Sequence, residues 1–517
     1  MTTLFQNCIE QKVALRDYQD DAVSKTIKGF AEYDRQLGVA PTGSGKTIIF
    51  AALARHFHEQ GQRTLILAHR EELIQQAADK LHSSTGIEAD VDKAEQRADH
   101  GAPVVVGSVQ TLMRAKRRER WAAEHFGFIV VDEAHHALAN SYQTVLGHFN
   151  GKVLGVTATP DRGDKKQLGK YFQNIAFEIG LVDLIKRGYL SRITIKSLPL
   201  KIDLNRVAVK HGDYDANELG GALAPYLAAI AQHVAFECSF RKTLVFLPLI
   251  DTSKAFTAAL RQRGVNAKHI DGDSPDRAQI LRRYHEGEID VLCNAMLLTE
   301  GYDEPPIDCL IPLRPTKSRP LYAQMVGRGT RITNTKEELL LLDFLWLHEK
   351  HTLIKPAHLI ASDEDQAKAI TKLIEESPGG GGEDLLRADS SVREQREEKL
   401  KRELAAKAKK SANTVDAMAY CLSVRAAALA DYQPTMAWEA KEVSPGQVSF
   451  LQRSRIDPAT ITCRGMASKV IDVIIGRHKQ HLATAKQVEY LTKYGHPTPE
   501  TATFEEAKKF LDERWKR

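Results

Sequence analysis

Short apolar runs of strand length alternate with longer mixed segments over the first part of the chain. Between residues 35 and 190 these runs are 64–68, 104–107, 128–132 and 153–157. Apolar residues at consecutive positions predict strands that are buried on both faces. The segments between them have helical length, as in 48–58. This alternation is typical of a parallel sheet that helices cover on both sides.

The same alternation resumes in a second region. Its strand-length runs are 243–247, 266–270, 291–294, 309–312 and 339–344, with helical segments at 253–263 and 275–286. Two successive α/β domains are the simplest account of this pattern. We expect them to join between Leu181 and Ser191.

The pattern changes beyond His351. Residues 377–382 read Ser-Pro-Gly-Gly-Gly-Gly, which predicts a flexible linker. The mixed charges of 392–410 predict an exposed helix, and the residues after 413 contain enough apolar side chains for a small helical domain. The predicted divisions of the chain are therefore 1–185, 186–355, 356–412 and 413–517.

Charge is unevenly distributed in an otherwise ordinary composition. The chain has 43% hydrophobic and 27% charged residues, which fits a globular protein and excludes wholesale disorder. Its net charge of +5 conceals a contrast, because residues 401–517 hold 20 basic and 13 acidic residues. The rest of the chain is therefore close to neutral, at −2. The basic segment either binds phosphate groups or is a solvated tail.

Targeting signals and metal motifs are not evident in the sequence. The apolar run 339–347 is short and contains Asp343, so we expect no membrane span. Residues 1–16 lack the pattern of a secretory signal. None of the six cysteines forms a C-x-x-C pair, so we expect reduced thiols and no structural zinc. These features favour a cytoplasmic location.

A phosphate-binding loop is the first chemical signal. Residues 40–47 read Ala-Pro-Thr-Gly-Ser-Gly-Lys-Thr and lie between a predicted strand and a predicted helix. Gly43 and Gly45 would let backbone N–H groups approach phosphate, Lys46 would neutralise it, and a hydroxyl from Thr47 would reach magnesium. The general pattern has glycine where Ala40 stands, so the match is incomplete there.

A pair of carboxylates is the second signal. Asp132 and Glu133 end the apolar run 128–132, which we expect beside the strand that precedes the phosphate loop. An aspartate there can hold magnesium through water, and a neighbouring glutamate can orient and deprotonate an attacking water. By itself such a pair is usually a solvated strand end, but the preceding phosphate loop makes the chemical interpretation stronger.

The two signals together resemble motifs I and II of superfamily 2 helicases of the DEAH type, since the acidic pair continues as Ala134-His135. Further segments resemble the remaining motifs of that family, in the family's order. They are 15–19 for adenine recognition, 68–71, 107–111, 157–160, 244–246, 298–305 and 324–331. The resemblance covers about residues 10–345 and implies two tandem RecA-like parallel-sheet domains with a C-terminal helical appendage.

The resemblance implies a site for ATP and Mg²⁺. The residues expected to bind nucleotide are Arg16, Gln19, Thr42, Gly43, Ser44, Gly45, Lys46, Thr47, Gly301 and Asp303. Those expected to hold the metal are Thr47 and Asp132, and those expected to act in catalysis are Glu133, Arg328, Arg331 and Gln324. The two arginines would present guanidinium groups to the transferring phosphoryl group, although alone they would suit a surface helix.

Nucleic acid is the partner that the resemblance implies. The positions expected to contact it are His69, Arg70, Ser108, Gln110, Thr111 and Thr299. Those expected to couple the two domains are His135, Thr157 and Thr159. Contacts to phosphate and sugar carry no sequence information, which suits a motor that moves along any sequence. Any one of these positions could instead belong to an ordinary loop.

Within the superfamily, 299–305 followed by 313–318 is similar to the RadD-like repair helicases and to restriction-enzyme motor subunits. The cysteine-rich zinc module expected after the second domain of RadD-like proteins is missing, since Cys421 and Cys463 stand singly. Residues 484–495 resemble a small helical tail of phage-type helicases instead.

These patterns predict an ATP-dependent nucleic-acid helicase, with DNA favoured over RNA. Two alternatives remain open. One is a motor that translocates along double-stranded DNA without separating its strands. The other is a nucleic-acid-binding protein whose affinity ATP switches without continuous turnover.

Overall fold

The computed structural model describes residues 14–68, 71–158, 168–210, 212–238, 240–299, 307–333, 336, 338–347, 353–376, 382–407, 415–424, 426, 429, 432, 434 and 438–515. Within this part, contacts divide the chain into two compact units. The larger contains residues 1–361 and 367–388, and the smaller contains 362–366 and 389–517.

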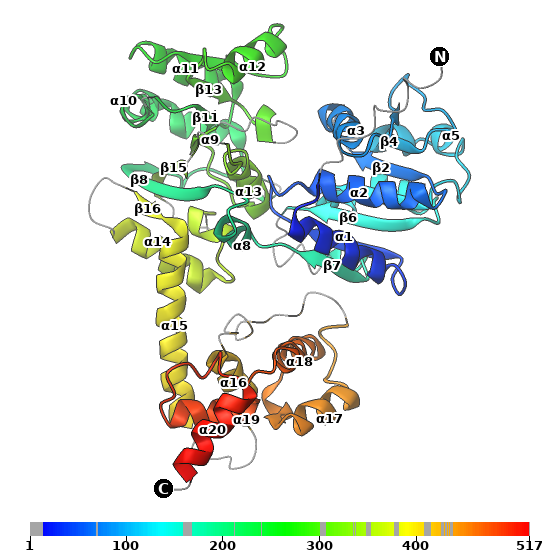
Figure 1. Cartoon of the computed structure of the whole chain (residues 1–517). Helices are drawn as coiled ribbons and strands as arrows, with labels where there is room; N and C mark the ends of the chain where they lie inside the picture. The colour runs from blue at the N-terminus through cyan, green and yellow to red at the C-terminus, as the bar shows by residue number, and fades with distance from the viewer. Residues whose placement is uncertain are drawn as a thin grey trace, which may run out of the picture. The chain divides into compact units, whose positions relative to one another are not determined.

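The first domain of the larger unit is built on a seven-stranded sheet (Figure 1). Its strands are β1 (Arg35–Val39), β2 (Thr64–Ala68), β3 (Ala89–Asp92), β4 (Val104–Ser108), β5 (Phe128–Asp132), β6 (Lys152–Thr157) and β7 (Asn174–Glu178). Their order is β3-β4-β2-β5-β6-β1-β7, and every pairing is parallel. The parallel sheet expected from the alternating pattern is confirmed.

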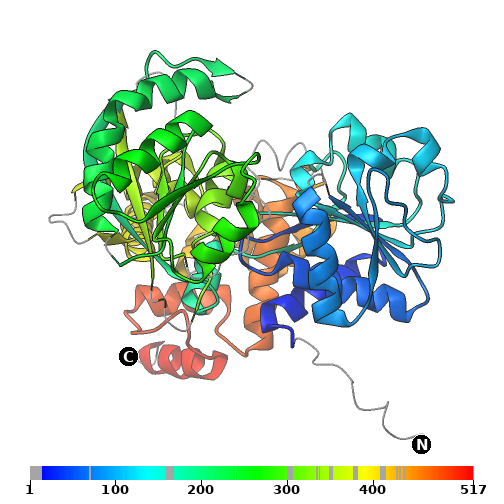
Figure 2. The same cartoon turned by 90° about the horizontal axis from the view of Figure 1, so that it is seen from above.

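Both faces of this sheet are buried because successive side chains of each strand point to opposite faces. In β5, Phe128 and Val130 pack with the helices α1 (Asp17–Gly29), α2 (Lys46–Glu59) and α3 (Glu71–Thr85). Ile129 and Val131 pack on the other face with α4 (Val109–Leu112) and α6 (Asn140–Leu146), while α5 (Ala115–Arg118) has no buried residue. Figure 2 shows helices on both sides of the sheet.

A second seven-stranded sheet follows the short helix α8 (Leu181–Lys186). Its strands are β8 (Arg192–Asp203), β11 (Thr243–Phe246), β12 (Ala267–Ile270), β13 (Val291–Asn294), β14 (Cys309–Pro312), β15 (Glu338–Leu347) and β16 (Glu383–Asp384). The order is β12-β13-β11-β14-β15-β8-β16, and only β16 pairs antiparallel. A small hairpin, β9 (Val209–Lys210) and β10 (Asp213–Tyr214), lies outside this sheet.

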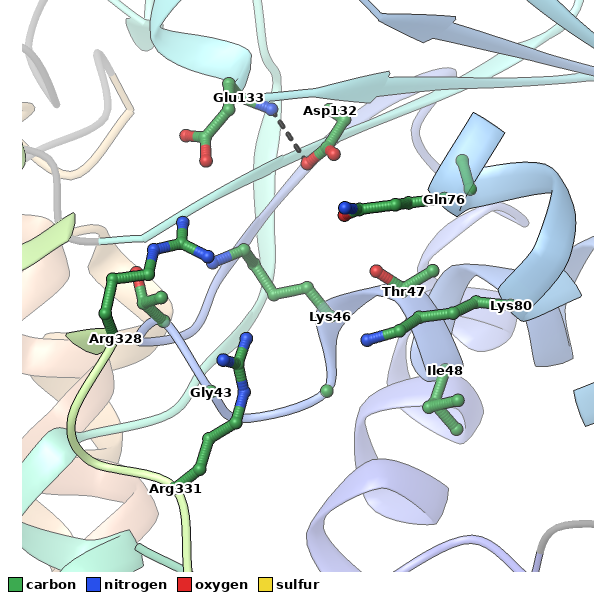
Figure 3. A pocket seen from close by; sticks show the side chains of 13 residues that line it. Gly43, Lys46, Thr47, Ile48, Gln76, Lys80, Asp132, Glu133, Arg328 and Arg331 are labelled. Carbon is green, nitrogen blue, oxygen red and sulfur yellow. Dashed lines mark hydrogen bonds between the residues drawn. The ribbon is translucent and has the colours of Figure 1, made fainter. Parts of the chain in front are cut away.

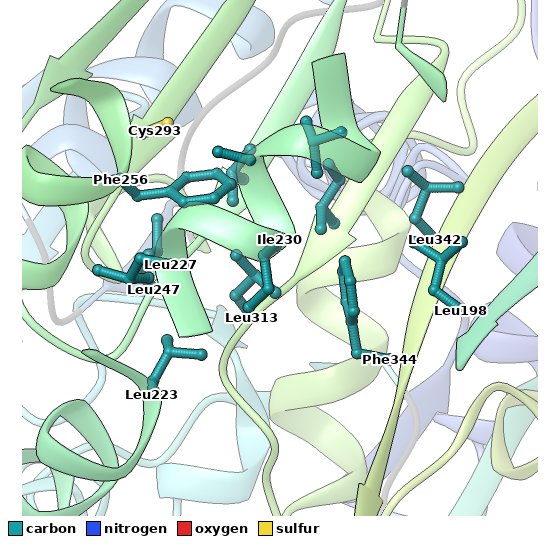
Figure 4. Packing of buried hydrophobic residues seen from close by; sticks show 14 of the residues in the cluster. Leu198, Leu223, Leu227, Ile230, Leu247, Phe256, Cys293, Leu313, Leu342 and Phe344 are labelled. Carbon is teal, nitrogen blue, oxygen red and sulfur yellow. The ribbon is translucent and has the colours of Figure 1, made fainter. Parts of the chain in front are cut away.

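The helices of this domain are α9 (Ala216–Leu223), α10 (Leu227–Glu237), α11 (Ile250–Arg261), α12 (Arg277–His285) and α13 (Arg319–Gly327). Figure 4 shows Leu223, Leu227 and Ile230 packing in one core with strand residues such as Leu342 and Phe344. The stretch Ala216–Glu237 is long and apolar enough to cross a membrane by length and composition. Packing in this core accounts for its apolar side chains equally well.

The segment 356–412, which the sequence predicts as a linker and an exposed helix, contains more structure than expected. It forms α14 (Glu364–Glu376), β16 and the long helix α15 (Leu385–Lys407). This helix begins seven residues before the predicted one, and Ala388, Asp389 and Val392 in its first turns are buried. Residues 377–381 of the glycine-rich segment lie outside the described residues.

The C-terminal part of the smaller unit is helical, as predicted. Its helices are α16 (Ala417–Ser423), α17 (Pro445–Arg453), α18 (Arg464–Lys479), α19 (Ala485–Lys493) and α20 (Phe504–Trp515), with a short pair of strands, β17 (Val415–Asp416) and β18 (Ile456–Asp457). Buried Arg477 donates from Nη1 to the Glu500 carbonyl and from Nη2 to the Ala483 carbonyl, and so joins α18 to the chain on both sides of α19.

Candidate functional site

The phosphate loop lies at the carboxyl end of β1, where the chain turns into α2. Gly43 and Gly45 have φ values of 86° and 80°, in the left-handed region that glycine adopts without strain. A Cβ at Gly45 would lie 2.5 Å from Nε2 of Gln19. The first N–H groups of α2 have no partner within the helix, and the positive end of its dipole faces the same point. The loop therefore forms an anion site.

The sheet order brings the acidic pair to the same edge as the loop. Asp132 ends β5, Thr157 ends β6, and both strands run parallel to β1. The expectation that β5 lies beside the strand of the phosphate loop is wrong, since β6 separates them. Because neighbouring strands lie about 4.8 Å apart, the carboxyl ends of β1 and β5 lie about 10 Å from each other, on either side of β6.

Both domains contribute to one pocket at this edge (Figure 3). It is lined by Thr42, Gly43, Gly45, Lys46, Thr47, Ile48, Gln76, Ala77, Lys80, Asp132, Glu133, Arg328 and Arg331. Figure 3 shows the two arginines on the side opposite to Gln76 and Lys80. The lining thus has four basic and two acidic side chains, an excess of positive charge that suits a polyphosphate.

The buried charges of Lys46 and Glu133 influence each other's pKa inside the pocket. Burial lowers the pKa of Lys46, although Glu133 and Asp132 act in the opposite direction. Burial alone would raise the pKa of Glu133, but a hydrogen bond with His135 and the charge of Lys46 outweigh it and hold that pKa below its usual range. Glu133 is therefore an ionised carboxylate at neutral pH.

Glu133 has an unusual backbone conformation for its residue type. Its φ of 51° lies in the left-handed region, which residues other than glycine, asparagine and aspartate rarely adopt. Its N–H donates to Oδ1 of Asp132 at 3.0 Å, and Nδ1 of His135 lies 3.4 Å from its Oε2. The strained turn places both carboxylates of the pair along the pocket.

The arginines follow α13 in a loop that approaches the phosphate loop closely. A Cβ at Gly327 would lie 2.3 Å from Cβ of Thr42, so only glycine permits this approach. The Thr330 hydroxyl donates to the Thr42 carbonyl at 3.5 Å, and the Ser191 N–H donates to the Thr330 carbonyl at 2.8 Å. Arg328 is 7% exposed.

The residues expected at the adenine contact the phosphate loop directly. The Tyr18 hydroxyl and Nε2 of Gln19 both donate to the Ser44 carbonyl, at 2.7 and 3.2 Å. Oε1 of Gln19 accepts from the Arg16 N–H at 3.0 Å. In this structure the Gln19 amide therefore orders the loop, and adenine recognition by Arg16 and Gln19 stays a prediction.

The side chains predicted to contact nucleic acid differ in how exposed they are. Ser108 and Thr111 are buried: the Ser108 hydroxyl donates to Oε1 of Gln110 at 2.9 Å, and the Thr111 hydroxyl accepts from the Ala94 N–H at 3.0 Å. Gln110 is exposed. Of the described residues among these positions, Gln110 has the side chain best placed to reach a ligand. The assignment of all of them stays a prediction.

Several predicted site residues lie outside the pocket or outside the described residues. Gln324, expected in catalysis, is buried in α13 and does not line the pocket. Thr157, expected to couple the domains, does not line it either, and its carbonyl accepts from the Ala40 N–H at 3.0 Å. His69, Arg70, Thr159, Gly301 and Asp303, together with the side chain of Thr299, lie outside the described residues.

The sequence did not identify Gln76 and Lys80 as lining residues. They lie four apart on α3, beside its buried face formed by Ile74, Ala77 and Leu81. Residues four apart share one side of a helix, so the spacing could have paired them. The spacing does not indicate that this side of the helix faces the nucleotide pocket.

Oxygen ligands in the pocket fit a magnesium ion. Thr47 supplies a hydroxyl, and Asp132 and Glu133 supply carboxylates to the same lining. Mg²⁺ prefers oxygen ligands and is usually bound by one or two carboxylates together with phosphates of the substrate.

Comparison with known proteins agrees with this geometry. The family model for the res subunit of type III restriction enzymes matches residues 12–162, and that for the helicase conserved C-terminal domain matches residues 227–333. The chain is 31% identical over 390 residues to IRC3 of Saccharomyces cerevisiae, which is described as a candidate ATP-dependent helicase. That match covers 70% of this chain and 56% of IRC3, so the chain spans little more than half the length of this relative.

Two solved structures share the fold. A fragment of a candidate HsdR subunit of a type I restriction enzyme from Vibrio vulnificus has a TM-score of 0.51 at 21% identity, over 63% of each chain. The ATP-dependent type ISP restriction-modification enzyme LlaBIII, solved bound to DNA, has a TM-score of 0.53 at 17% identity, over 72% of this chain and 31% of that one. With its two parallel-sheet domains and both family matches, the chain belongs to the superfamily 2 helicases, and restriction-enzyme motor subunits are among its relatives.

Proposed function

We propose that the chain is a nucleic-acid-stimulated ATPase that converts ATP hydrolysis into movement along nucleic acid and separation of its strands. The observation that supports this most directly is the composition of one pocket. It gathers the phosphate loop and the acidic pair from the first domain and two arginines from the second. Such a site needs both domains for catalysis, so hydrolysis depends on their arrangement.

Each side chain of the pocket has a chemical task in this proposal. Lys46 and the first N–H groups of α2 bind the β- and γ-phosphates. Glu133 is the ionised acceptor that orients the attacking water, and His135 beside it limits its rotation. A magnesium ion held by Thr47 and Asp132 would neutralise phosphate charge when bound.

Arg328 and Arg331 act on the transition state in this mechanism. Negative charge spreads over the oxygens of the transferring phosphoryl group, and guanidinium groups stabilise it as the bond breaks. Because both come from the second domain, movement of that domain turns hydrolysis on and off. Nucleic acid bound to both domains would favour the active arrangement, so we expect it to stimulate hydrolysis. We propose DNA as the preferred polymer.

Glu133→Gln tests the proposal because it keeps the size of the side chain and removes its basicity. We expect kcat for ATP to fall about 1,000-fold, the usual contribution of a general base. The Kd for a non-hydrolysable ATP analogue should change less than about threefold, since the glutamate contributes to the chemical step. Glu124→Gln, at an exposed glutamate outside the pocket, is the matched control. Full turnover by Glu133→Gln would show that the base is wrongly assigned.

The activating polymer is identified in the same assay. ATPase activity is titrated with single-stranded, duplex and forked DNA and with RNA at one stated salt concentration, because electrostatic binding depends strongly on salt. Equal stimulation by RNA would contradict the preference for DNA. Nucleotide binding without turnover on any polymer would favour an ATP-switched binding protein instead.

Translocation without strand separation is a second candidate function, which the relatives named for restriction enzymes favour. A strand-displacement assay run beside a triplex-displacement assay separates the two. A motor that only translocates removes the third strand of a triplex and leaves the duplex paired.

A further inference from the structure

Lys336 makes an unusual set of contacts just beyond the arginine loop, defined here as residues 327–331. Its ammonium donates to the carbonyls of Ile307 at 2.6 Å and of Arg331 at 3.1 Å, and it also donates to the Gly329 carbonyl. A lysine ammonium has three N–H donors and no acceptor. Three backbone carbonyls therefore match the full donor capacity of this side chain.

These carbonyls belong to two separate segments of the second domain. Gly329 and Arg331 lie in the arginine loop on either side of Thr330, whereas Ile307 lies two residues before β14. The lysine thus ties the loop to the beginning of a central strand. Charge-assisted hydrogen bonds of this kind are roughly twice as strong as neutral ones.

The other described bonds of the loop do not involve charged donors. The N–H groups of Arg328, Gly329 and Thr330 donate to carbonyls three residues earlier, and the Thr330 hydroxyl also donates to the Gly327 carbonyl at 3.1 Å. The Ser191 N–H holds the Thr330 carbonyl, and the Thr330 hydroxyl reaches Thr42 at 3.5 Å, close to the limit for a hydrogen bond. Neither of these bonds involves the carbonyls of Gly329 or Arg331. Among the described bonds, Lys336 is the donor that holds the carbonyls of Gly329 and Arg331.

The surroundings of Lys336 make its charge sensitive to pH near neutrality. Burial lowers the pKa of Lys336 to about 7, with Asp308 acting to raise it and Arg331 acting to lower it. Burial also raises the pKa of Asp308, against the nearby Arg241. The protonated lysine has a donor for each of the three carbonyls, whereas the neutral amine has only two.

We propose that Lys336 is a positioning residue that holds the arginine loop so that Arg328 and Arg331 enter the nucleotide pocket. This inference rests on the proposed function, because it assumes that both arginines act in ATP hydrolysis. Lys336 itself does not line the pocket. Its effect is therefore expected on the rate of the chemical step and not on nucleotide affinity.

Lys336→Met is the first test, since methionine keeps much of the side-chain length and removes the donors. We expect kcat to fall about tenfold, the effect of losing one or two charge-assisted hydrogen bonds. The Kd for a non-hydrolysable ATP analogue should change less than about twofold, because the phosphate loop is unaffected. Lys254→Met removes a lysine of the same domain that is 59% exposed, and it should leave both values unchanged.

A double-mutant cycle shows whether Lys336 acts through the arginine. If it does, adding Lys336→Met to Arg331→Ala should lower kcat by clearly less than the tenfold loss expected in the wild-type background, because one of the two positioned groups is already gone. The pH profile supplies a second readout. The ratio of the wild-type kcat to the kcat of Lys336→Met should fall as pH rises from about 6 to 8.5, because the lysine loses its proton and one of its three donors.

Three results would overturn the inference. One is unchanged kcat in Lys336→Met, and another is additive loss in the double mutant. The third is equal loss of turnover and nucleotide binding, which would show that the lysine only supports the fold. The wild type in the same assays tests the proposed function separately, because absence of wild-type turnover contradicts that function whatever Lys336 does.

Discussion

The two halves of the nucleotide pocket are held in different ways. The first half is the phosphate loop and the start of α2, which are contiguous in the chain and are held within the first domain. The left-handed φ values of Gly43 and Gly45 shape the loop, and Tyr18 and Gln19 donate to its Ser44 carbonyl. The second half is the arginine loop, which is held by residues far away in sequence, Ser191 and Ile307 through Lys336. Nucleotide binding therefore depends mainly on contacts within the first domain, and catalysis depends also on the contacts that hold the arginine loop in the second.

This difference predicts that turnover and nucleotide affinity can be changed independently. Contacts within one domain survive small movements between the domains, so the phosphate loop should bind nucleotide whether or not the second domain is well placed. A displacement of about 1 Å in the arginine loop should instead reduce the rate strongly, because catalytic groups need accurate orientation. The variants below test this separation, from the largest expected effect to the smallest.

Gly327→Ala is expected to show the largest difference between its effect on turnover and its effect on nucleotide affinity. The added Cβ would lie 2.3 Å from Cβ of Thr42, a distance that forces the arginine loop away from the phosphate loop. We expect kcat to fall about 100-fold, as for other misplaced catalytic groups. The Kd for an ATP analogue should rise less than about threefold.

Gly221→Ala is the control for that variant, since a Cβ there meets no atom within 4 Å. Its kcat and Kd should equal those of the wild type. If Gly327→Ala weakened nucleotide binding as much as it slowed turnover, the two halves of the pocket would not be independent, and the contrast between them would be wrong.

The basic C-terminal region belongs to neither half of the nucleotide pocket, so changes there should affect neither nucleotide binding nor the chemical step. Residues 401–410 hold five basic residues and one acidic residue, whereas 438–515 hold 12 basic and 10 acidic residues. The charge excess noted for residues 401–517 is therefore concentrated at the end of α15 and just beyond it, more than in the helical domain. We propose this short segment as a contact for nucleic-acid phosphates.

Replacing Lys401, Arg402, Lys407, Lys409 and Lys410 by glutamine tests that assignment. The Kd for single-stranded DNA should rise about tenfold at 0.1 M salt and the slope of log K against log salt should become shallower, as counterion release predicts. The Kd for nucleotide should stay within about twofold of the wild type. An unchanged DNA affinity and salt slope would identify the segment as a solvated tail.

The sequence predicted the sheets and the first half of the pocket well for a physical reason. Buried parallel strands need consecutive apolar residues, and a phosphate loop needs glycines and a lysine at fixed spacing. The strands β3, β7 and β8, and the short strands β9, β10 and β16, were not predicted. In β3, Asp90 and Asp92 interrupt the apolar pattern, and Asp92 is buried because Arg117 pairs with it at 2.7 Å.

The second half of the pocket was only partly predictable. Arg328 and Arg331 were identified by resemblance, and both line the pocket. No spacing rule marks Lys336, because its partners are backbone carbonyls that any residue provides. Nor could the sequence show that β6 lies between β1 and β5, since the order of strands in a parallel sheet depends on packing between distant segments.

The most direct test of the account is a paired measurement on Lys46→Ala and Arg331→Ala. Both variants are assayed for the Kd of a non-hydrolysable ATP analogue with magnesium and for kcat with saturating nucleic acid. We predict that Lys46→Ala weakens binding at least about 30-fold, the loss of a buried charged contact. Arg331→Ala should bind the analogue within about threefold of the wild type while kcat falls at least about 100-fold. Equal loss of affinity in the two variants, or normal turnover by Arg331→Ala, would contradict the division of the pocket into a binding half and a catalytic half.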